Sequence, residues 1–260
     1  MLLRDARRRG VTLEQAASTW PAHPSWAVGE KGKSTLREFL SFTSGFEDPP
    51  PCASIAAGSW ARCAPKLTSS KLTTPRRYRY GTHHMMVALD GLSAADNDAH
   101  PSASLLKRFQ DETKLLSSTK HDSDKPLSLM ITPGDYAAFL RALSTHQLLT
   151  KGEEAAMYAD QIGDKEIAIS PAQRAEEHGR ITGTWHYGLG NWLQCEKGQP
   201  CGTHHHSAGA RGFYPFIDLG IDVDSGVYGV VAHNAGLGDW DVSHALYLAI
   251  KDELPLITRP

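Results

Sequence analysis

The sequence predicts a single α+β domain, because helical patterns come first along the chain and β-type patterns follow. The strongest helical pattern covers residues 131–150, where Thr132 can cap the helix and Pro133 takes its first position. After residue 181 the chain changes to runs of aromatic and β-branched residues punctuated by glycine. A turn at 224–226 would pair the last two runs as an antiparallel hairpin. Helices followed by a hairpin and a final helix are typical of an α+β domain.

The other elements follow from apolar spacing and from turn residues. The predicted helices cover residues 1–10, 35–42, 82–92, 105–116, 131–150 and 241–254, and the β-type runs cover residues 184–195, 211–223 and 226–234. Gly10 is expected to end the first helix, and Ser34 is expected to cap the second. Residues 47–79 are expected to be loop, since three consecutive prolines exclude helix there, and residues 93–103 a polar linker.

The composition excludes several kinds of partner. The 260 residues are 40% hydrophobic and 22% charged, with a formal net charge of −2. This balance gives no electrostatic reason to expect nucleic acid or an acidic membrane surface as a partner. No apolar run has the length of a membrane span, and the basic start lacks the apolar core of a signal peptide. We expect one domain over residues 1–260 with no nucleic-acid partner and no membrane span.

The four cysteines form two local pairs, Cys52 with Cys63 and Cys195 with Cys201. Neither pair has the spacing of a zinc knuckle. Each pair could close a short loop as a disulfide, which would indicate a secreted or lumenal protein, or all four could be free thiols in a reducing compartment. The localisation is therefore left open.

Five motifs in order resemble the serine β-lactamase/penicillin-binding-protein family, in particular its branch of β-lactamase-related esterases and peptidases. They are TLREFLSFTSGF (35–46), the triplet Tyr80-Gly81-Thr82, ITPGDYAAFLRAL (131–143), YGLGNW (187–192) and the long stretch from HHHSAGARGF onward (204–234). The resemblance implies a β-lactamase/transpeptidase-like fold, which is an antiparallel sheet flanked by helices. Here the fold would lack its first strands and the start of the nucleophile helix, so that the sheet would have an unpaired edge.

The resemblance also implies one wall of a substrate cleft. The family's edge strand, which often carries a Lys-Thr-Gly triplet, falls on residues 206–210, with Ser207 at the lysine position or, one residue earlier, His206. Small residues there let a substrate carbonyl approach the backbone. Gly209 lies in that stretch, and the N–H of Ala210 would point at the developing oxyanion.

Tyr80 is the candidate base by the same resemblance. It would accept or relay the nucleophile's proton, with a pKa lowered by the nearby Arg76, Arg77 and Arg79. Thr82 replaces the family's asparagine. It keeps one donor and one acceptor but loses the reach of the amide toward a substrate.

The family's nucleophile is a serine three residues before a lysine, at the start of a buried helix. Placed by resemblance, this element falls upstream of Met1, since Gly10 matches the glycine that ends that helix. The two Ser-x-x-Lys matches in the chain, at 104–107 and 117–120, lie downstream of Tyr80, which is the wrong order for the family. The sequence therefore looks like an N-terminally incomplete member, or one that has lost catalysis.

These observations predict a β-lactamase-related serine hydrolase that acts on an ester, amide or β-lactam in a small molecule or peptide. We expect the given sequence to have little of this activity, because the Ser-x-x-Lys element would lie upstream of Met1. Two alternatives remain open. One is a non-catalytic binding or scaffold protein that keeps the cleft as a ligand pocket. The other is a metalloprotein in which His204 and His206, on one face of a strand, share a metal with a third ligand. We expect no cofactor and no metal.

Overall fold

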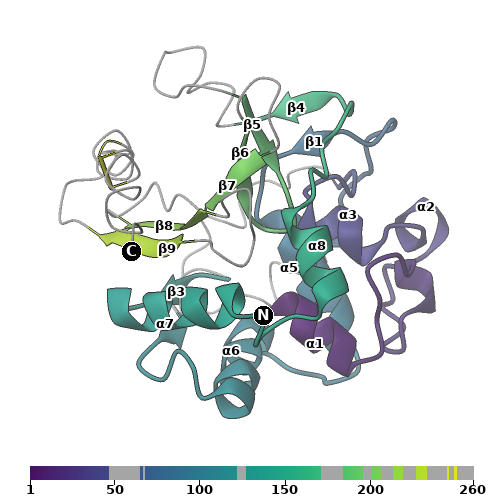
Figure 1. The fold of residues 1–260 in the computed structure, drawn as a ribbon. Helices are drawn as coiled ribbons and strands as arrows, with labels where there is room; N and C mark the ends of the chain where they lie inside the picture. The colour runs from purple at the N-terminus through teal and green to yellow at the C-terminus, as the bar shows by residue number, and fades with distance from the viewer. Residues whose placement is uncertain are drawn as a thin grey trace.

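The structure is a computed structural model that describes residues 1–46, 65–66, 68–121, 127–170, 184–195, 201–205, 213–218, 227–232, 245 and 249–250. The helical part of the chain, purple to teal in Figure 1, lies beside a sheet of green to yellow-green strands. This order of helices before sheet is the one that the sequence predicts.

The helices follow the predicted pattern with different ends. They are α1 (Leu2–Arg8), η1 (Ala17–Thr19), α2 (Gly29–Gly32), α3 (Leu36–Leu40), α5 (His83–Ser93), α6 (Pro101–Thr113), α7 (Pro133–Ser144) and α8 (Lys151–Tyr158). The helix predicted at 82–92 is confirmed as α5. The linker predicted at 93–103 is too long, because α6 already begins at Pro101, a residue suited to a first helical turn. The helix predicted at 131–150 ends at Ser144, and α8, which was not predicted, follows it.

Helix α1 ends at a glycine, as predicted. Gly10 has a φ of 73°, its N–H donates to the Arg7 carbonyl (3.0 Å), and the Val11 N–H donates to the Ala6 carbonyl (2.9 Å). These two bonds form a Schellman motif, whose left-handed residue is most easily a glycine.

Helix α3 is capped by Thr35, and the prediction of Ser34 is wrong. The Thr35 hydroxyl accepts from the Glu38 N–H (3.3 Å), and the Glu38 carboxylate accepts from the Thr35 N–H (2.9 Å), which makes a capping box. Ser34 is buried, and its hydroxyl has no hydrogen-bond partner among the described residues. The side chain of Ser34 therefore belongs to the core, and the next residue satisfies the helix N-terminus.

An aromatic core joins the first helices to α5. Trp20, Trp26, Phe39 and Phe46 contact one another at centroid distances between 5.6 and 6.4 Å. Gly91 of α5 lies against the two indoles, since an added Cβ would come within 2.7 Å of Trp20 and 2.8 Å of Trp26. The absence of a side chain at this position lets α5 approach the indoles closely.

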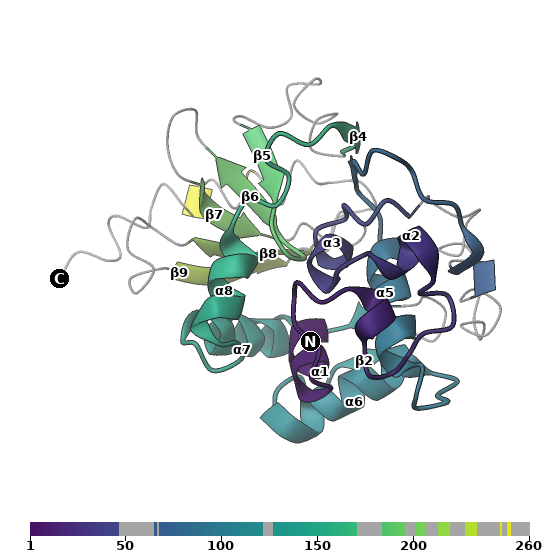
Figure 2. The same ribbon diagram turned by 90° about the vertical axis from the view of Figure 1, so that its right-hand side faces the viewer.

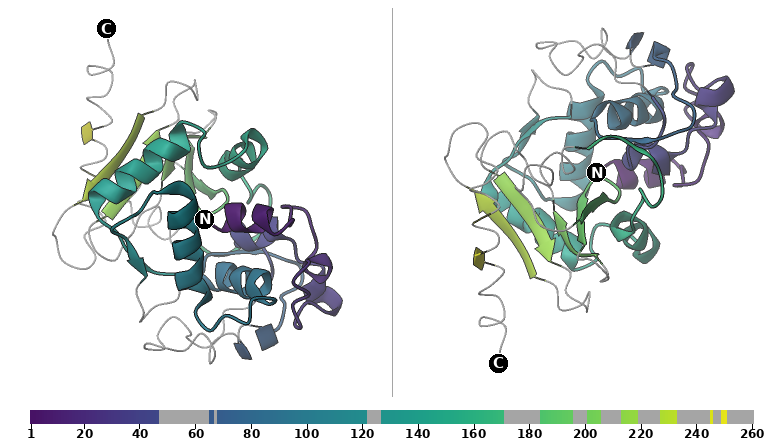
Figure 3. Two further views of the ribbon diagram at one scale, coloured as in Figure 1. Left: turned by 90° about the horizontal axis from the view of Figure 1, so that it is seen from below. Right: turned by 90° about the horizontal axis from the view of Figure 1, so that it is seen from above.

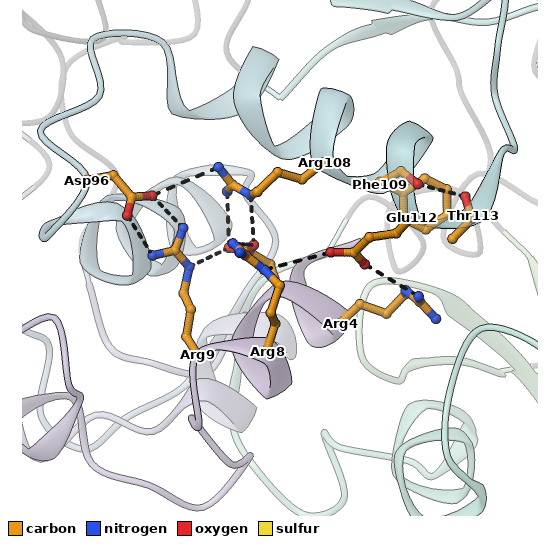
Figure 4. Close-up of polar contacts among 9 residues, drawn as sticks. Arg4, Arg8, Arg9, Asp96, Arg108, Phe109, Glu112 and Thr113 are labelled. Atoms are coloured by element: carbon orange, nitrogen blue, oxygen red, sulfur yellow. Dashed lines mark hydrogen bonds and ion pairs between the residues drawn. The ribbon is translucent and has the colours of Figure 1, made fainter.

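A network of ion pairs joins α1 to α6 and to the segment between α5 and α6 (Figure 4). Asp5 is buried and accepts from Arg8 (2.9 Å), Arg9 (2.8 Å) and Arg108 (3.0 and 3.2 Å). Arg9 and Arg108 also contact the carboxylate of Asp96. A buried carboxylate needs such partners, because leaving it unpaired would cost several kcal/mol.

The strands form two short pairs and one long sheet. They are β1 (Tyr78–Arg79), β2 (Lys120–His121), β3 (Leu129–Met130), β4 (Ile167–Ile169), β5 (Thr184–Tyr187), β6 (Trp192–Cys195), β7 (Cys201–His205), β8 (Phe213–Asp218) and β9 (Val227–Ala232). β1 pairs with β4 in parallel, and β2 pairs with β3. The long sheet is antiparallel with the order β5-β6-β7-β8-β9.

Several predictions about strands can be compared with this sheet. The hairpin predicted around the turn at 224–226 is confirmed as β8 and β9. The run predicted at 184–195 is two strands, and the segment 47–79 ends in β1 where only loop was expected. Of the helix predicted at 241–254, residues 245, 249 and 250 are described, and they are helical.

Helices cover one face of the long sheet. Seen from below, the teal helix α7 crosses β8 and β9 (Figure 3), and Val230 of β9 packs with Phe109, Leu140 and Leu143 of the apolar cluster between α6 and α7. The turned view places α6 at the bottom of the molecule and β4 at the top (Figure 2). The start of α5 and the β5–β6 hairpin meet at the aromatic cluster of Phe42, Tyr78, Trp185, Tyr187 and Trp192, with Tyr80 packed against it.

Candidate functional site around Tyr80

Tyr80 directly follows β1, in the segment that leads into α5. Backbone bonds hold β1 on both sides, since the Tyr78 N–H donates to the Glu166 carbonyl (3.0 Å) and the Arg79 N–H donates to the Phe42 carbonyl (2.9 Å). Tyr78 is fully buried. The turn after α3 and the residue before β4 therefore set the position of Tyr80.

The Tyr80 ring lies in the aromatic cluster beside the long sheet. It stacks on Trp192 of β6, with centroids 5.1 Å apart and planes at 16°, and it lies nearly perpendicular to the Phe42 ring, with centroids 5.3 Å apart. Tyr187 of β5 lies at 6.0 Å. Aromatic pairs of this kind contribute about 1 kcal/mol each beyond the area they bury. Packing therefore fixes the direction of the partly exposed Tyr80 side chain.

The expected effect of the arginines on Tyr80 is wrong. Burial raises the pKa of Tyr80 above its ordinary value of 10, and no cation lowers it. Arg76 forms an ion pair with Glu38, and Arg77 forms one with Glu166 at 2.8 Å. These two guanidinium charges are therefore matched by carboxylates. Tyr80 is a neutral phenol near pH 7, which donates a proton or hydrogen bond more readily than it accepts a proton.

Thr82 occupies the N-cap position of α5, but its side chain makes no capping bond and is exposed. Its hydroxyl can therefore reach a ligand, and its predicted contact with substrate stays a prediction. Gly81, between Tyr80 and Thr82, has no room for a side chain, because a Cβ would lie 2.5 Å from the Nδ1 atom of the buried His83.

A buried serine–histidine pair contacts the residue before Tyr80, and the sequence analysis did not predict it. The Ser44 Oγ atom is 2.6 Å from Nδ1 of His84, and Nε2 of His84 is 3.0 Å from the Arg79 carbonyl oxygen. Both side chains are fully buried. Burial, and then the neighbouring His83, lower the pKa of His84 well below 6.5. The signal in the sequence was two adjacent histidines in a helix that is otherwise apolar.

Strand β7 leads from this cluster into the predicted cleft wall. In the ladder of β6 and β7, Trp192 lies opposite His205 and Leu193 lies opposite His204. Opposite residues share a sheet face, so position 205 is on the face that Tyr80 contacts through Trp192. The edge position expected for the segment 206–210 does not apply to β7, which lies between β6 and β8.

Many of the predicted site residues lie outside the described residues. They are His206, Ser207, Gly209, Ala210, Cys52 and Cys63. Cys195 and Cys201 are described as strand residues and lie opposite each other in the ladder of β6 and β7, at an irregularity in the register. Their predicted pairing stays a prediction.

Among the described residues, no three histidine, cysteine or acidic side chains gather in a group that could hold a metal ion. The predicted absence of a metal and of a cofactor, and the alternative of a metal on His204 and His206, both stay untested. The helices in the described part of the chain lack the combination of length and hydrophobicity that crossing a bilayer requires.

Neither Ser-x-x-Lys match of the chain has the setting of a nucleophile. Lys107 on α6 is 70% exposed and binds the Asp111 carboxylate at 2.6 Å. Ser117 and Lys120 are exposed, outside any described helix. Helix α6 also lies at the opposite end of the molecule from β1, the strand directly before Tyr80, and its partner β4 (Figure 1). The chemistry needs a lysine amine held against a serine hydroxyl in a buried helix, and neither match supplies it.

Comparison with known proteins identifies the fold. No family model and no curated protein matches the chain by sequence. A solved structure from Bacteroides dorei DSM 17855, assigned as a β-lactamase, matches with a TM-score of 0.74 at 20% identity, over 96% of this chain and 80% of that one. A β-lactamase/D-alanine carboxypeptidase from Yersinia pestis matches with a TM-score of 0.66 at 14% identity, over 97% and 80% of the two chains. A penicillin-binding protein from Bacillus halodurans matches with a TM-score of 0.64 at 13% identity, over 95% and 82%.

The chain therefore has the fold of the serine β-lactamases and penicillin-binding proteins. This confirms the predicted resemblance and the predicted α+β class. At identities of 20% and below, the likeness establishes the fold, and the chemistry has to be argued from the residues of this chain.

Proposed function

We propose that the chain forms the cleft of a β-lactamase-related serine hydrolase, a class that hydrolyses an ester, amide or β-lactam through an acyl-enzyme. The substrate would be a small molecule or a peptide. The observation that carries this proposal is the position of Tyr80, which is stacked on Trp192 of β6 beside the strand that leads into residues 206–210. By the resemblance to this family, the cleft would lie between the segment that carries Tyr80 and the residues 206–210.

The individual roles follow from the chemistry of the side chains. Tyr80 would donate to the leaving group or to a bound carbonyl, as a phenol with a raised pKa does. The N–H of Ala210 would stabilise an oxyanion, with Gly209 giving room for the substrate backbone. His206 or Ser207 would take the position of the triplet's lysine, and the exposed hydroxyl of Thr82 would contact the substrate.

We further propose that this polypeptide alone has little acyl-transfer activity. Lys107 binds a carboxylate in solvent, so the serine before it has no amine to accept its proton. The other Ser-x-x-Lys match is exposed. Neither of these two serines is therefore activated to form the ester, while the cleft can still bind an acyl compound.

A non-catalytic ligand-binding or scaffold role is the second candidate. It is favoured by the raised pKa of Tyr80, which makes this side chain a poor base at neutral pH. The raised pKa weakens proton transfer to Tyr80 and leaves ligand binding possible.

Covalent labelling with a fluorescent penicillin and a fluorophosphonate tests the proposal of low activity. We expect no stoichiometric label on the chain, and the same result for the control variants Ser104→Ala and Ser117→Ala. Reversible penicillin binding, followed by calorimetry, should weaken about tenfold in Tyr80→Ala, which corresponds to about 1.4 kcal/mol. Stoichiometric labelling would refute the low activity, and Tyr80-independent binding would refute the cleft.

The cysteine pairs carry a separate proposal. Because Cys195 and Cys201 are ladder neighbours, a disulfide between them would close the short connection of β6 and β7. The same proposal covers Cys52 with Cys63, and it would indicate an oxidising compartment. Mass spectrometry of peptides cleaved without reductant should find each bridge as a linked pair of peptides. Four alkylated thiols would contradict it.

A further inference from the structure

The Ser44–His84 pair makes a hydrogen bond to the carbonyl of Arg79, which belongs to the peptide bond between Arg79 and Tyr80. A carbonyl oxygen only accepts, so the 3.0 Å contact to the Arg79 carbonyl requires the proton of His84 on Nε2. Nδ1 is then an acceptor, and the Ser44 hydroxyl donates to it at 2.6 Å. One neutral tautomer satisfies both contacts, and this chain of bonds runs from the turn after α3 to the residue before Tyr80.

Both backbone groups of Arg79 are held by that same turn. Its N–H donates directly to the Phe42 carbonyl at 2.9 Å, and its carbonyl is tied to Ser44 through the His84 ring. The peptide plane between Arg79 and Tyr80 is therefore fixed from two sides. The orientation of this plane helps to set the direction in which the side chain of Tyr80 leaves the backbone.

Phe42 completes the contact between the turn and the tyrosine. It has a φ of 60°, which is uncommon for a residue with a side chain, and its ring stacks on His84 at 5.5 Å and lies nearly perpendicular to the Tyr80 ring at 5.3 Å. Such a conformation costs about 1 kcal/mol or more and persists only where surrounding contacts determine it. The ring contacts of Phe42 with His84 and Tyr80 are among those that stabilise its conformation.

We propose that His84 is a positioning residue for Tyr80, which holds the Arg79–Tyr80 peptide in place through a neutral side chain oriented by Ser44. This inference rests on the proposed role of Tyr80 in an acyl-binding cleft. His84 itself is fully buried, so it acts through Tyr80 and does not contact a ligand.

Two variants of His84 test its hydrogen bonds to Arg79 and to Ser44 separately. The amide of Gln reaches the position of Nε2 and can still donate to Arg79, whereas the amide of Asn reaches the position of Nδ1 and can still contact Ser44. We expect His84→Gln to retain most of the near-ultraviolet circular dichroism that Tyr80→Ala removes, which reports the stack on Trp192. His84→Asn should lose more than half of it. Equal signals in the two variants would overturn the proposal.

A serine pair controls for the loss of a buried hydroxyl. Ser41 and Ser44 are both buried in the same turn, but among the described residues the Ser41 hydroxyl bonds to Thr43 and the Glu38 carbonyl, and not to His84. We expect Ser44→Ala to broaden or shift the ¹⁵N signals of the His84 ring and to reduce the dichroism, and Ser41→Ala to change neither. Identical spectra in the two alanine variants would refute the role of Ser44, even where a His84 variant fails to fold.

Penicillin affinity distinguishes this inference from the proposed function. If Tyr80→Ala and His84→Asn both weaken binding and His84→Gln restores it, both proposals are supported. If Tyr80→Ala leaves the affinity unchanged, the proposed function fails, and with it the functional part of this inference. The dichroism and the ¹⁵N signals then still decide whether His84 positions the tyrosine.

Discussion

At the scale of single residues, burial decides the protonation state of the groups around Tyr80. It raises the pKa of Tyr80 and of Tyr78, and it lowers that of His84. Each of these groups is neutral at pH 7 for the same reason, which is that the charged form would be poorly solvated where the side chain lies.

His84 gives the first prediction, which concerns stability against pH. Its folded pKa lies below 6.5 while its unfolded pKa is about 6.5, so its contribution is complete above about pH 6.5 and is lost as the pH falls below it. We expect the free energy of unfolding in urea to fall by up to about 1.4 kcal/mol per pH unit below that point. His84→Gln should flatten this slope.

His186 provides a control for that measurement, because its linkage has the opposite sign. The hydrogen bond to Asp160 (2.6 Å) raises the pKa of His186. The resulting stabilisation is present below about pH 6.5 and is lost as the pH rises through the folded pKa. His186→Ala should therefore leave the acid-side loss in place. An unchanged slope in His84→Gln would contradict the burial of a neutral ring.

At the scale of secondary-structure elements, the attachment of α1 to α6 depends on one carboxylate. Asp5 is 5% exposed and contacts three arginines, which are Arg8 of α1, the C-cap residue Arg9, and Arg108 of α6 (Figure 4). These contacts outweigh the burial and lower the pKa of Asp5, although burial on its own would raise it. Helix α1 has seven residues, too few to be stable alone, so it depends on this contact and on its apolar face.

Replacing Asp5 with Asn should destabilise the protein by about 2 kcal/mol, because hydrogen bonds from three arginines lose their buried carboxylate while Arg9 and Arg108 keep the Asp96 carboxylate. The control is Asp111→Asn, which breaks an exposed pair with Lys107 on α6 and should cost less than about 0.5 kcal/mol. Urea unfolding measures both. The wild type should lose the contribution of Asp5 only as the pH falls below about 4, since its pKa is lowered from 3.8. Equal costs for the two variants would contradict the network's role.

The cap of α3 gives a prediction that separates two neighbouring residues. Thr35→Ala removes half of a capping box and should cost about 1 kcal/mol. Ser34→Ala removes a buried hydroxyl without a hydrogen-bond partner among the described residues, and should be neutral or slightly stabilising. Thermal unfolding distinguishes the two, and a larger loss from Ser34→Ala would restore Ser34 as the cap.

At the scale of the whole molecule, sequence patterns predicted the elements that have strong periodicity. Helix α5 was found because its run of mostly apolar residues is buried, and the β8–β9 hairpin was found because two β-type runs flank a turn sequence. Helix α8 was missed because its eight residues carry few apolar side chains, and one of the residues that it buries is the charged Glu154. The signal that could have found it is the capping box Thr150-x-x-Glu153, the same pattern that caps α3.

The candidate site was only partly predictable, since its properties come from residues that are distant in sequence. The resemblance pointed to Tyr80 as a candidate base, but its pKa depends on burial against Trp192 and Tyr187, more than 100 positions away. The three arginines near it in sequence suggested a positive field, and the ion pairs of Arg76 and Arg77 with Glu38 and Glu166 could be seen only in the fold.

The position of a bound acyl compound in a crystal structure tests the proposed cleft without depending on turnover. Crystals of this chain soaked with a penicillin should show the intact lactam between the Tyr80 side chain and the backbone of residues 209–210, with no bond to any serine. A ligand bound elsewhere, or Tyr80 and Gly209 on separate faces of the molecule with no shared cavity, would contradict the proposed function.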